Sequence, residues 1–282
     1  MQEGKFSRTA YGVAVRRAAH QLFDDPRVLD DPLALQIVGQ KAVDALRSKP
    51  REATSSISRA FRAFLAVRSR YSEDQIAAAA EAGVNQCVIL GAGLDTFAYR
   101  NRNHALHVFE VDHPATQVWK RERLQAARIP VPTSVTFVPV NFERQTLAER
   151  LAESGFDSRA GAFFSWLGVT PYLTREACMA TLGFIASMPA GSGVAFDYAV
   201  DASLLNLKQK LVFYALSRRV ALAGEPFQLF FHPQKLTEEL RQMGFARTDG
   251  LDGAEINCRY FQNRADGLHV SGGLGRLMGA WV

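Results

Sequence analysis

The spacing of apolar residues changes near Gly83. Before this residue the apolar side chains recur at helical spacing, most clearly in a run from about Ser58 to Ala82. An earlier helix is predicted to begin at Asp31-Pro32, with Asp31 as the N-cap and Pro32 in the first helical position. The tripeptide 49–51 (Lys-Pro-Arg) predicts a break between these two helices. The first 82 residues are therefore expected to be helical.

After Gly83, short apolar runs alternate with segments of helical spacing. The runs that predict strands are Cys87–Leu90, Leu106–Val111, Val135–Val138, Ala162–Trp166 and Gly193–Asp197. The segments that predict helices between them are Ala115–Ala127, Leu147–Ser154 and Arg175–Met188. Alternating strands and helices are typical of a parallel sheet with helices on both faces, and right-handed crossovers make such a sheet doubly wound.

The segment beyond Asp197 predicts two helices and then the last strands. The helices are expected over Leu204–Ala223 and Pro233–Met243, and the strands over Ile256–Phe261 and Leu268–Val270. The chain is thus predicted to be an α/β protein. A Rossmann-like core of residues 83–282 would carry a helical N-terminal extension, residues 1–82, as a cap, and the two parts would form one compact unit.

Composition narrows the class of protein. With 282 residues, 48% of them hydrophobic and 22% charged, the chain is long enough to bury a large core without disulfides or metals. It contains no run of 18 apolar residues and no apolar N-terminal segment, so neither a membrane helix nor a secretory signal is expected, and we predict a cytoplasmic protein. Its three cysteines are widely spaced and predict reduced thiols without a metal site.

Positive charge is concentrated near the N-terminus. The first 70 residues contain 13 Lys and Arg against 7 Asp and Glu, in a chain of net charge +5. Such a region suits a small anionic ligand or a nucleic acid. Acidic residues are interspersed and no basic block stands out, so we favour a small molecule and rank nucleic-acid methylation lower.

A glycine-rich turn follows the first predicted strand, in the sequence Val-Ile-Leu-Gly-Ala-Gly-Leu-Asp-Thr of residues 88–96. Gly91 and Gly93 would let the chain turn sharply and let a ligand approach the backbone. A nicotinamide fingerprint would need a third glycine where Thr96 stands, and the Gly-Lys-Ser/Thr of a phosphate-binding loop is absent. The pattern favours S-adenosylmethionine, against the alternative of a tight turn without a ligand.

Polar residues near the predicted strand ends extend this candidate site. Asp112 lies 21 residues beyond Gly91, where an acidic side chain accepts hydrogen bonds from ribose hydroxyls, in NAD as well as in S-adenosylmethionine. Asn141 is a candidate for the adenine edge, with Phe142 packed on the ring, although a turn asparagine is an equal alternative. Arg68 is a candidate partner for the carboxylate of the cofactor, or else a helix-surface arginine.

Four motifs together resemble the leucine carboxyl methyltransferase-like family of S-adenosylmethionine-dependent methyltransferases. They are Arg-Ser-Arg-Tyr-Ser-Glu-Asp (68–74), Leu-Gly-Ala-Gly-Leu-Asp-Thr (90–96), Phe-Glu-Val-Asp-His-Pro (109–114) and Ser-Trp-Leu-Gly-Val-Thr-Pro-Tyr-Leu (165–173). The segments 16–20, 30–34 and 259–268 are similar to the bacterial branch, which includes polyketide O-methyltransferases of the tetracenomycin type. The resemblance therefore covers nearly the whole chain.

The resemblance implies a Rossmann-like class I methyltransferase fold, with a mostly parallel seven-stranded sheet and an N-terminal helical lid. It also implies that Arg68, rather than Arg70, holds the cofactor carboxylate. The implied cofactor-binding residues are Arg68, Gly91, Gly93, Asp112, Asn141 and Phe142. Two positions depart from the family: Asn141 stands where the family usually has Asp, and Phe97 stands where the bacterial branch often has Arg. The tryptophan at 166 also fits the bacterial branch.

The methyl acceptor is predicted only by class. We expect an O-methyltransferase that acts on a carboxylate or a phenolic hydroxyl of a small secondary metabolite, with Arg17, His20 and Tyr172 as catalytic candidates and His232 and Tyr260 as further acceptor-site candidates. A carboxylate acceptor needs no general base, whereas a phenol benefits from one. The alternatives are an S-adenosylmethionine-binding protein without catalysis and an NAD(P)-dependent oxidoreductase. The sequence makes no prediction of oligomeric state.

Overall fold

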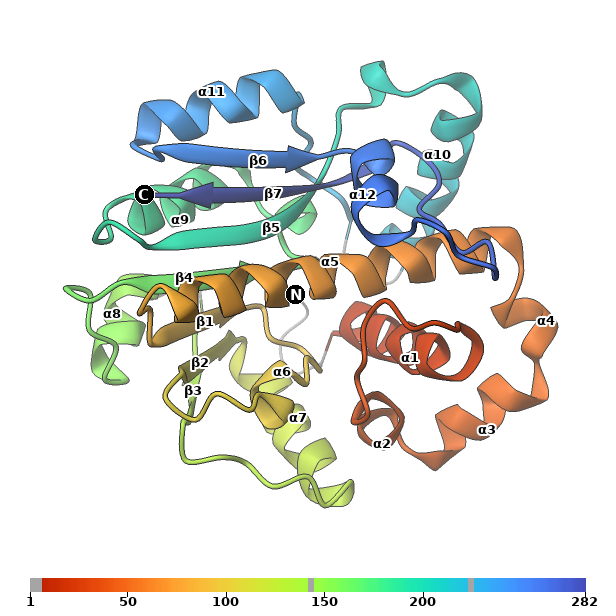
Figure 1. Cartoon of the computed structure of the whole chain (residues 1–282), viewed down its shortest axis with the longest axis horizontal. Helices are drawn as coiled ribbons and strands as arrows, with labels where there is room; N and C mark the ends of the chain where they lie inside the picture. Colours follow the sequence, from red (N-terminus) through yellow and green to blue (C-terminus); the bar gives the residue numbers. More distant parts are fainter. Residues whose placement is uncertain (1–6, 142–144, 223–225) are drawn as a thin grey trace.

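The fold is built on a seven-stranded sheet in the order β3-β2-β1-β4-β5-β7-β6, in which only β7 runs antiparallel to its neighbours. The computed structural model describes residues 7–141, 145–222 and 226–282 (Figure 1). The strands are β1 (Gln86–Leu90), β2 (His107–Asp112), β3 (Val135–Pro139), β4 (Ala162–Trp166), β5 (Gly193–Ala199), β6 (Arg247–Leu251) and β7 (Gly275–Trp281). The predicted α/β class and the mostly parallel sheet are confirmed.

One face of the sheet packs against helices from the second half of the chain. Side chains such as Val88, Phe164 and Phe196 point to this face and form one buried cluster with helical residues, nearly all of them from three helices. These helices are α8 (Leu147–Glu153), α9 (Arg175–Ala186) and α11 (Pro233–Met243). Their predicted ranges were nearly the same. Helix α10 (Leu207–Leu222) precedes α11 in the chain, and its Phe213 belongs to the same cluster.

The long helix α5 (Ser56–Glu81) covers the opposite face. Its residues Ala63, Val67 and Tyr71 are fully buried in a second cluster with Cys87, Ile89 and other sheet residues. The short helix α4 (Pro50–Ala53) precedes α5, and the short helix α6 (Phe97–Arg100) follows β1. Helix α12 (Gly253–Tyr260) contributes Ile256 to the same cluster. Since α5 shares a core with the sheet, the predicted boundary at residue 82 divides a continuous packing unit and stays a prediction.

The first three helices form a separate group beyond the sheet. They are α1 (Arg8–Phe23), α2 (Ala34–Val38) and α3 (Gln40–Ser48), and their apolar residues form a third cluster with Leu94 and with Leu124 of α7 (Pro114–Ala126). Figure 1 shows α1 and α10 beyond the same end of the sheet. The region between them is therefore bounded by the N-terminal helices and by the β5–α11 segment.

Three predictions of local structure are wrong. The segment Ile256–Phe261 lies mostly in α12, and Leu268–Val270 forms no strand, because the outer strands are instead the polar β6 and the glycine-containing β7. Asp31 is not a helix cap: α2 begins only at Ala34, after an N-cap at Leu33, and the Asp31 side chain is fully buried in an ion pair. The break near Pro50 is confirmed, since α3 ends at Ser48.

Among the residues that the structure describes, no helix is long and apolar enough to cross a membrane.

Candidate functional site

The sheet has its topological switch point between β1 and β4. The chain first adds β2 and β3 on one side of β1, then returns to add β4 and β5 on the other side. In open α/β sheets the ligand crevice lies at such a switch point, outside the carboxyl ends of the strands. The glycine-rich turn after β1 and the loop after β4 therefore define the candidate site, with α1 and α10 at the same end (Figure 1).

Both glycines of the turn have backbone conformations that L-residues rarely adopt. Gly91 has a φ of +68°, and a methyl group there would lie 2.3 Å from Cγ2 of Val169 in the loop after β4. Gly93 has a φ of +45°, and a methyl group there would lie 3.1 Å from Cβ of Ala10 in α1. Glycine is therefore needed here for the backbone and for the close approach of two other segments.

Asp112 lies at the carboxyl end of β2, next to this turn. Its Oδ2 accepts a 2.6 Å hydrogen bond from the amide of Gly93, and its Oδ1 accepts one of 2.7 Å from the amide of His113. Burial raises the pKa of Asp112 and outweighs the two hydrogen bonds, which lower it. Asp112, which the sequence predicts to bind the ribose, thus lies at the turn and also orders the backbone of Gly93.

Arg68 extends from α5 to the carboxyl ends of β4 and β5 and is 7% exposed. Its Nη1 donates a 2.9 Å hydrogen bond to Oδ2 of Asp197, the fifth residue of β5. A methyl group on Gly168 would come within 2.7 Å of Nη2 of Arg68, so the guanidinium lies against the loop after β4. Arg70, by contrast, is half exposed and pairs with Asp74 on the same helix. The structure therefore brings Arg68, and not Arg70, to the site.

Asn141 follows the carboxyl end of β3, and its amide donates a 3.1 Å hydrogen bond to Oε1 of Gln145. It lies beyond Val140, whose amide bonds to the backbone oxygen of Asp112. The predicted partner Phe142 lies outside the described residues.

Arg17 of α1 contacts the end of the glycine-rich turn. Its Nη2 bonds to Oδ2 of Asp31 at 2.5 Å and to Oγ1 of Thr96 at 2.6 Å, and its Nη1 lies 3.4 Å from Oδ2 of Asp95. Burial alone raises the pKa of Asp31, but the charges of Arg17 and Arg100 outweigh it and hold that pKa below its usual value. Arg17 is only 4% exposed, so these contacts occupy it within the protein.

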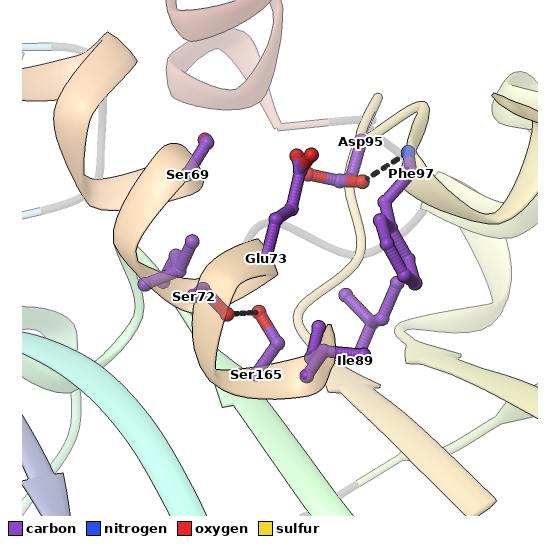
Figure 2. A pocket seen from close by; sticks show the side chains of 9 residues that line it. Ser69, Ser72, Glu73, Ile89, Asp95, Phe97 and Ser165 are labelled. Atoms are coloured by element: carbon purple, nitrogen blue, oxygen red, sulfur yellow. Dashed lines mark hydrogen bonds between the residues drawn. The ribbon is translucent and has the colours of Figure 1, made fainter. Parts of the chain in front are cut away.

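A small polar pocket lies between α5, β1, β4 and the turn (Figure 2). In it the Glu73 carboxylate faces Asp95, and the Ser72 hydroxyl donates a 2.8 Å hydrogen bond to that of Ser165. Glu73 also forms a two-bond ion pair with Arg100, yet burial raises its pKa overall. Phe97, the departure from the bacterial pattern, lines this pocket with its ring.

His20 has both ring nitrogens engaged inside the N-terminal segment. Nδ1 lies 2.7 Å from Oδ2 of Asp24, and Nε2 accepts hydrogen bonds from the amides of Val28 and Leu29 at 3.0 and 3.2 Å. Because Nε2 accepts two N–H groups, the ring hydrogen lies on Nδ1 and is donated to Asp24. The sequence patterns did not indicate this role, which depends on the fold of residues 24–29.

The remaining acceptor candidates lie in three places. Tyr172 is in the 3₁₀ turn after β4 (Thr170–Tyr172), and its ring lies 5.3 Å from that of Phe227 between centroids. His232 precedes α11 and lines a second hollow with Arg175. Tyr260 donates a 3.0 Å hydrogen bond to Asp74 on the outer side of α5. Tyr172 alone of the three lies in the loop that also contacts Gly91.

Glu110 has a structural environment. Its carboxylate is fully buried and bonds to Nζ of Lys120 and to the hydroxyl of Tyr99, both at 2.7 Å.

Sequence reasoning missed Asp197 and Val169 as site residues. The carboxylate that ends the predicted strand Gly193–Asp197 was the available signal for the first, whereas nothing in the sequence indicated the contact of Val169 with Gly91.

Comparisons with known proteins show the family of the chain. A family model described as leucine carboxyl methyltransferase matches residues 10–186. YktD of Bacillus subtilis (strain 168), named as a candidate S-adenosyl-L-methionine-dependent methyltransferase, is 31% identical over 95% of both chains. A similarly named protein of Mycobacterium avium (strain 104) is 33% identical over 70% of this chain and 67% of its own.

Solved structures support the fold. A candidate methyltransferase from Thermobifida fusca YX has a TM-score of 0.57 at 16% identity and covers 99% of this chain and 96% of its own. A DUF574 family protein from Streptomyces avermitilis has a TM-score of 0.54 at 13% identity, with 96% of both chains covered. Since the family model spans more than half of the chain, and the Bacillus relative nearly all of it, the chain belongs to the leucine carboxyl methyltransferase family of S-adenosyl-L-methionine-dependent methyltransferases.

Proposed function

We propose that this methyltransferase methylates an oxygen atom of a small acid or phenol, with a carboxylate as the preferred acceptor. In this proposal Arg68, Gly91, Gly93, Asp112 and Asn141 hold the methyl donor, together with Phe142. The name of the matching family, leucine carboxyl methyltransferase, supports a carboxyl acceptor.

The residues present fit the proposed donor. A cationic side chain suits its carboxylate, and Arg68 keeps Nε and Nη2 without a hydrogen bond to any residue in the described part of the chain. A carboxylate suits ribose hydroxyls, and Asp112 lies at the end of β2 next to the turn. The absence of a Cβ at Gly93 lets Ala10 of α1 approach the turn closely, so that α1 borders the proposed donor site.

When bound, S-adenosyl-L-methionine supplies a methyl group on a positively charged sulfur, which an acceptor oxygen can take without further activation if that oxygen is already anionic. The protein then has mainly to orient the acceptor and exclude water. Tyr172 and Phe227, whose rings lie 5.3 Å apart, are proposed as one wall of the acceptor pocket.

The engagement of Arg17 and His20 carries the preference for a carboxylate. Both were predicted from the sequence as catalytic residues near the acceptor, yet Arg17 is held by Asp31 and Thr96 and His20 by Asp24 and two backbone amides. The imidazole of His20 therefore has no nitrogen free to take a proton from a phenol, and the guanidinium of Arg17, which is always protonated, cannot act as a base. A carboxylate acceptor is ionised at neutral pH and needs no such base.

Titration calorimetry with S-adenosylmethionine, S-adenosylhomocysteine and NADH tests the donor, and a screen of organic acids and phenols then tests the acceptor. We expect saturable binding of the first two ligands and none of NADH. We further expect products that release methanol in alkali, as methyl esters do. Products stable to alkali, as aryl methyl ethers are, would contradict the carboxylate preference and support the phenol.

A further inference from the structure

The carboxylate of Asp197 joins three segments at the site. Asp197 lies near the end of β5 and is 5% exposed. Its Oδ2 accepts the 2.9 Å hydrogen bond from Nη1 of Arg68 in α5, and its Oδ1 accepts a 2.5 Å hydrogen bond from the amide of Gly168 in the loop after β4. Its backbone oxygen accepts the hydroxyl of Thr170 at 2.7 Å. One residue of β5 therefore determines where α5 and this loop meet.

The loop held by Asp197 also contacts the glycine-rich turn. Gly168 has a φ of +71°, and its missing methyl group would lie 2.7 and 2.9 Å from Nη2 and Nη1 of Arg68. The next residue, Val169, is the one that lies against Gly91. The loop after β4 is thus packed between the guanidinium and the turn. A shift of this loop would move Arg68 and the turn together.

An arginine at this depth needs a partner that fixes its direction. An uncompensated charge at 7% exposure is costly, and a long side chain has many rotamers to lose. Asp197 supplies the opposite charge at Nη1 only, whereas Nε and Nη2 have no hydrogen bond to the described residues. The ion pair therefore holds the guanidinium in one orientation and leaves it N–H groups for a second anion.

We propose that Asp197 is a positioning residue for donor binding: it holds Arg68 in the orientation that receives the carboxylate of the methyl donor and holds the Gly168–Val169 loop against the turn. Asp197 does not itself touch the donor in this account. The inference rests on the proposed role of Arg68 as the carboxylate ligand and adds to it a residue that the recognised motifs do not include.

The test compares donor binding with and without the carboxylate. S-adenosylmethionine and its decarboxylated analogue are titrated by calorimetry into the wild type and into the variants Asp197→Asn, Asp197→Ala and Arg68→Ala. We expect Asp197→Ala to weaken the binding of S-adenosylmethionine at least tenfold and that of the analogue less than threefold. Asp197→Asn keeps an oxygen that can accept from Gly168 or Arg68, so its loss is expected to be smaller.

A double variant and a control sharpen the comparison. If Asp197 acts mainly through Arg68, adding Asp197→Ala to Arg68→Ala weakens S-adenosylmethionine binding by less than a further threefold, the loss expected from the loop contact alone. Thr170→Val removes the hydrogen bond between the loop and the backbone oxygen of Asp197 but keeps the carboxylate, so its effect on the two ligands should be equal. Thermal unfolding of each variant reports whether it is folded, and Asp197→Asn serves if Asp197→Ala is not.

Three results would overturn the inference. The first is an equal loss of affinity for both ligands in the Asp197 variants. The second is tighter binding of S-adenosylmethionine by Asp197→Asn, which would mean that Asp197 competes with the donor for Arg68. The third is a carboxylate-selective loss of affinity in Thr170→Val. The proposed role of Arg68 fails separately, if Arg68→Ala binds S-adenosylmethionine as the wild type does. A selective loss in Arg68→Ala without one in the Asp197 variants removes only this inference.

Discussion

The guanidinium of Arg17 in α1 donates a 2.6 Å hydrogen bond from Nη2 to Oγ1 of Thr96, the last residue of the glycine-rich turn. Both side chains also bond to Oδ2 of Asp31, Arg17 at 2.5 Å and Thr96 at 2.7 Å. The N-terminal helices are thus bound to the turn by a buried, charged contact. This contact accounts for the burial of Arg17, and it predicts that the residue contributes to stability.

Replacing Arg17 with Met should lower the free energy of unfolding by about 3–5 kcal/mol, because Asp31 would remain buried without its main partner. Urea denaturation measures this loss. Arg27→Met is a matched control in the same segment: Arg27 pairs with Asp30 at the surface, and their side chains are 49% and 76% exposed. The control should change stability by no more than about 0.5 kcal/mol. An Arg17→Met protein of unchanged stability but without turnover would support the catalytic role predicted from the sequence instead.

The interior strands were predictable because each is buried on both faces. Segments such as Cys87–Leu90 and Ala162–Trp166 form continuous apolar runs, which is typical of parallel strands under helices. The outer strands lack this signal. The sequence of β6 is Arg-Thr-Asp-Gly-Leu, mostly exposed or half-buried, and β7 contains two glycines. Part of helix α12 and a non-helical segment were therefore predicted as the last strands instead.

The site was predictable only where chain direction and spacing determine position. Asp112 follows a strand whose carboxyl end must lie beside the turn, so its place could be deduced from the motif. Arg17 and His20 could not be assigned this way. The partners of Arg17 are set by how α1 packs on the turn, and Thr96 lies 79 residues from Arg17 in the chain. The partners of His20 are set by the fold of residues 24–29. A basic residue near the N-terminus has the same sequence signal whether it meets a ligand or a buried carboxylate.

Asp24 should contribute to stability in a pH-dependent way. Burial alone raises its pKa, but the hydrogen bonds from Arg62 and His20 outweigh this effect and lower the pKa from 3.8 to about 2. A depressed pKa in the folded state stabilises the protein above about pH 4, and this contribution is lost as the pH falls through about 2.

Between pH 4 and pH 2 the wild type should therefore lose about 2 kcal/mol more of its unfolding free energy than Asp24→Asn does. Denaturant unfolding at several pH values measures the difference between the two proteins. Asp30→Asn serves as the control, since Asp30 is 76% exposed, and it should follow the wild type. Parallel curves for the wild type and Asp24→Asn would contradict the prediction.

Gly91→Ala should impair both folding stability and donor binding. Its positive φ costs an alanine about 1–2 kcal/mol, and the added methyl group would also lie 2.3 Å from Val169. Gly83→Ala isolates the first effect, because Gly83 has a φ of +94° but no atom within 4 Å of the added methyl group. We expect Gly91→Ala to be the less stable of the two, and only this variant to lose affinity for S-adenosylmethionine in calorimetry. Equal affinity in both variants would show that the Gly91–Val169 contact is not needed for binding.

Asp112→Asn should weaken the binding of S-adenosylmethionine by about 1–3 kcal/mol, or about 5- to 150-fold, the usual effect of losing a charge-assisted hydrogen bond. Titration calorimetry at neutral pH measures this loss.

The pH dependence of S-adenosylmethionine binding gives a second measurement of the role of Asp112. Because burial raises the pKa of Asp112, its carboxylate takes up a proton at a higher pH than an ordinary aspartate. Protonation removes an acceptor for the ribose hydroxyls, so the affinity of the wild type should fall as the pH is lowered toward that raised pKa. The affinity of Asp112→Asn, which has no proton to take up at this position, should change less over the same interval. Asp157→Asn is the control and should match the wild type, since the Asp157 side chain precedes β4, is 47% exposed and pairs with Arg159. If the wild type and Asp112→Asn bind equally well at neutral pH, the ribose role is refuted, and the hydrogen bonds from Gly93 and His113 to the Asp112 carboxylate order the turn alone.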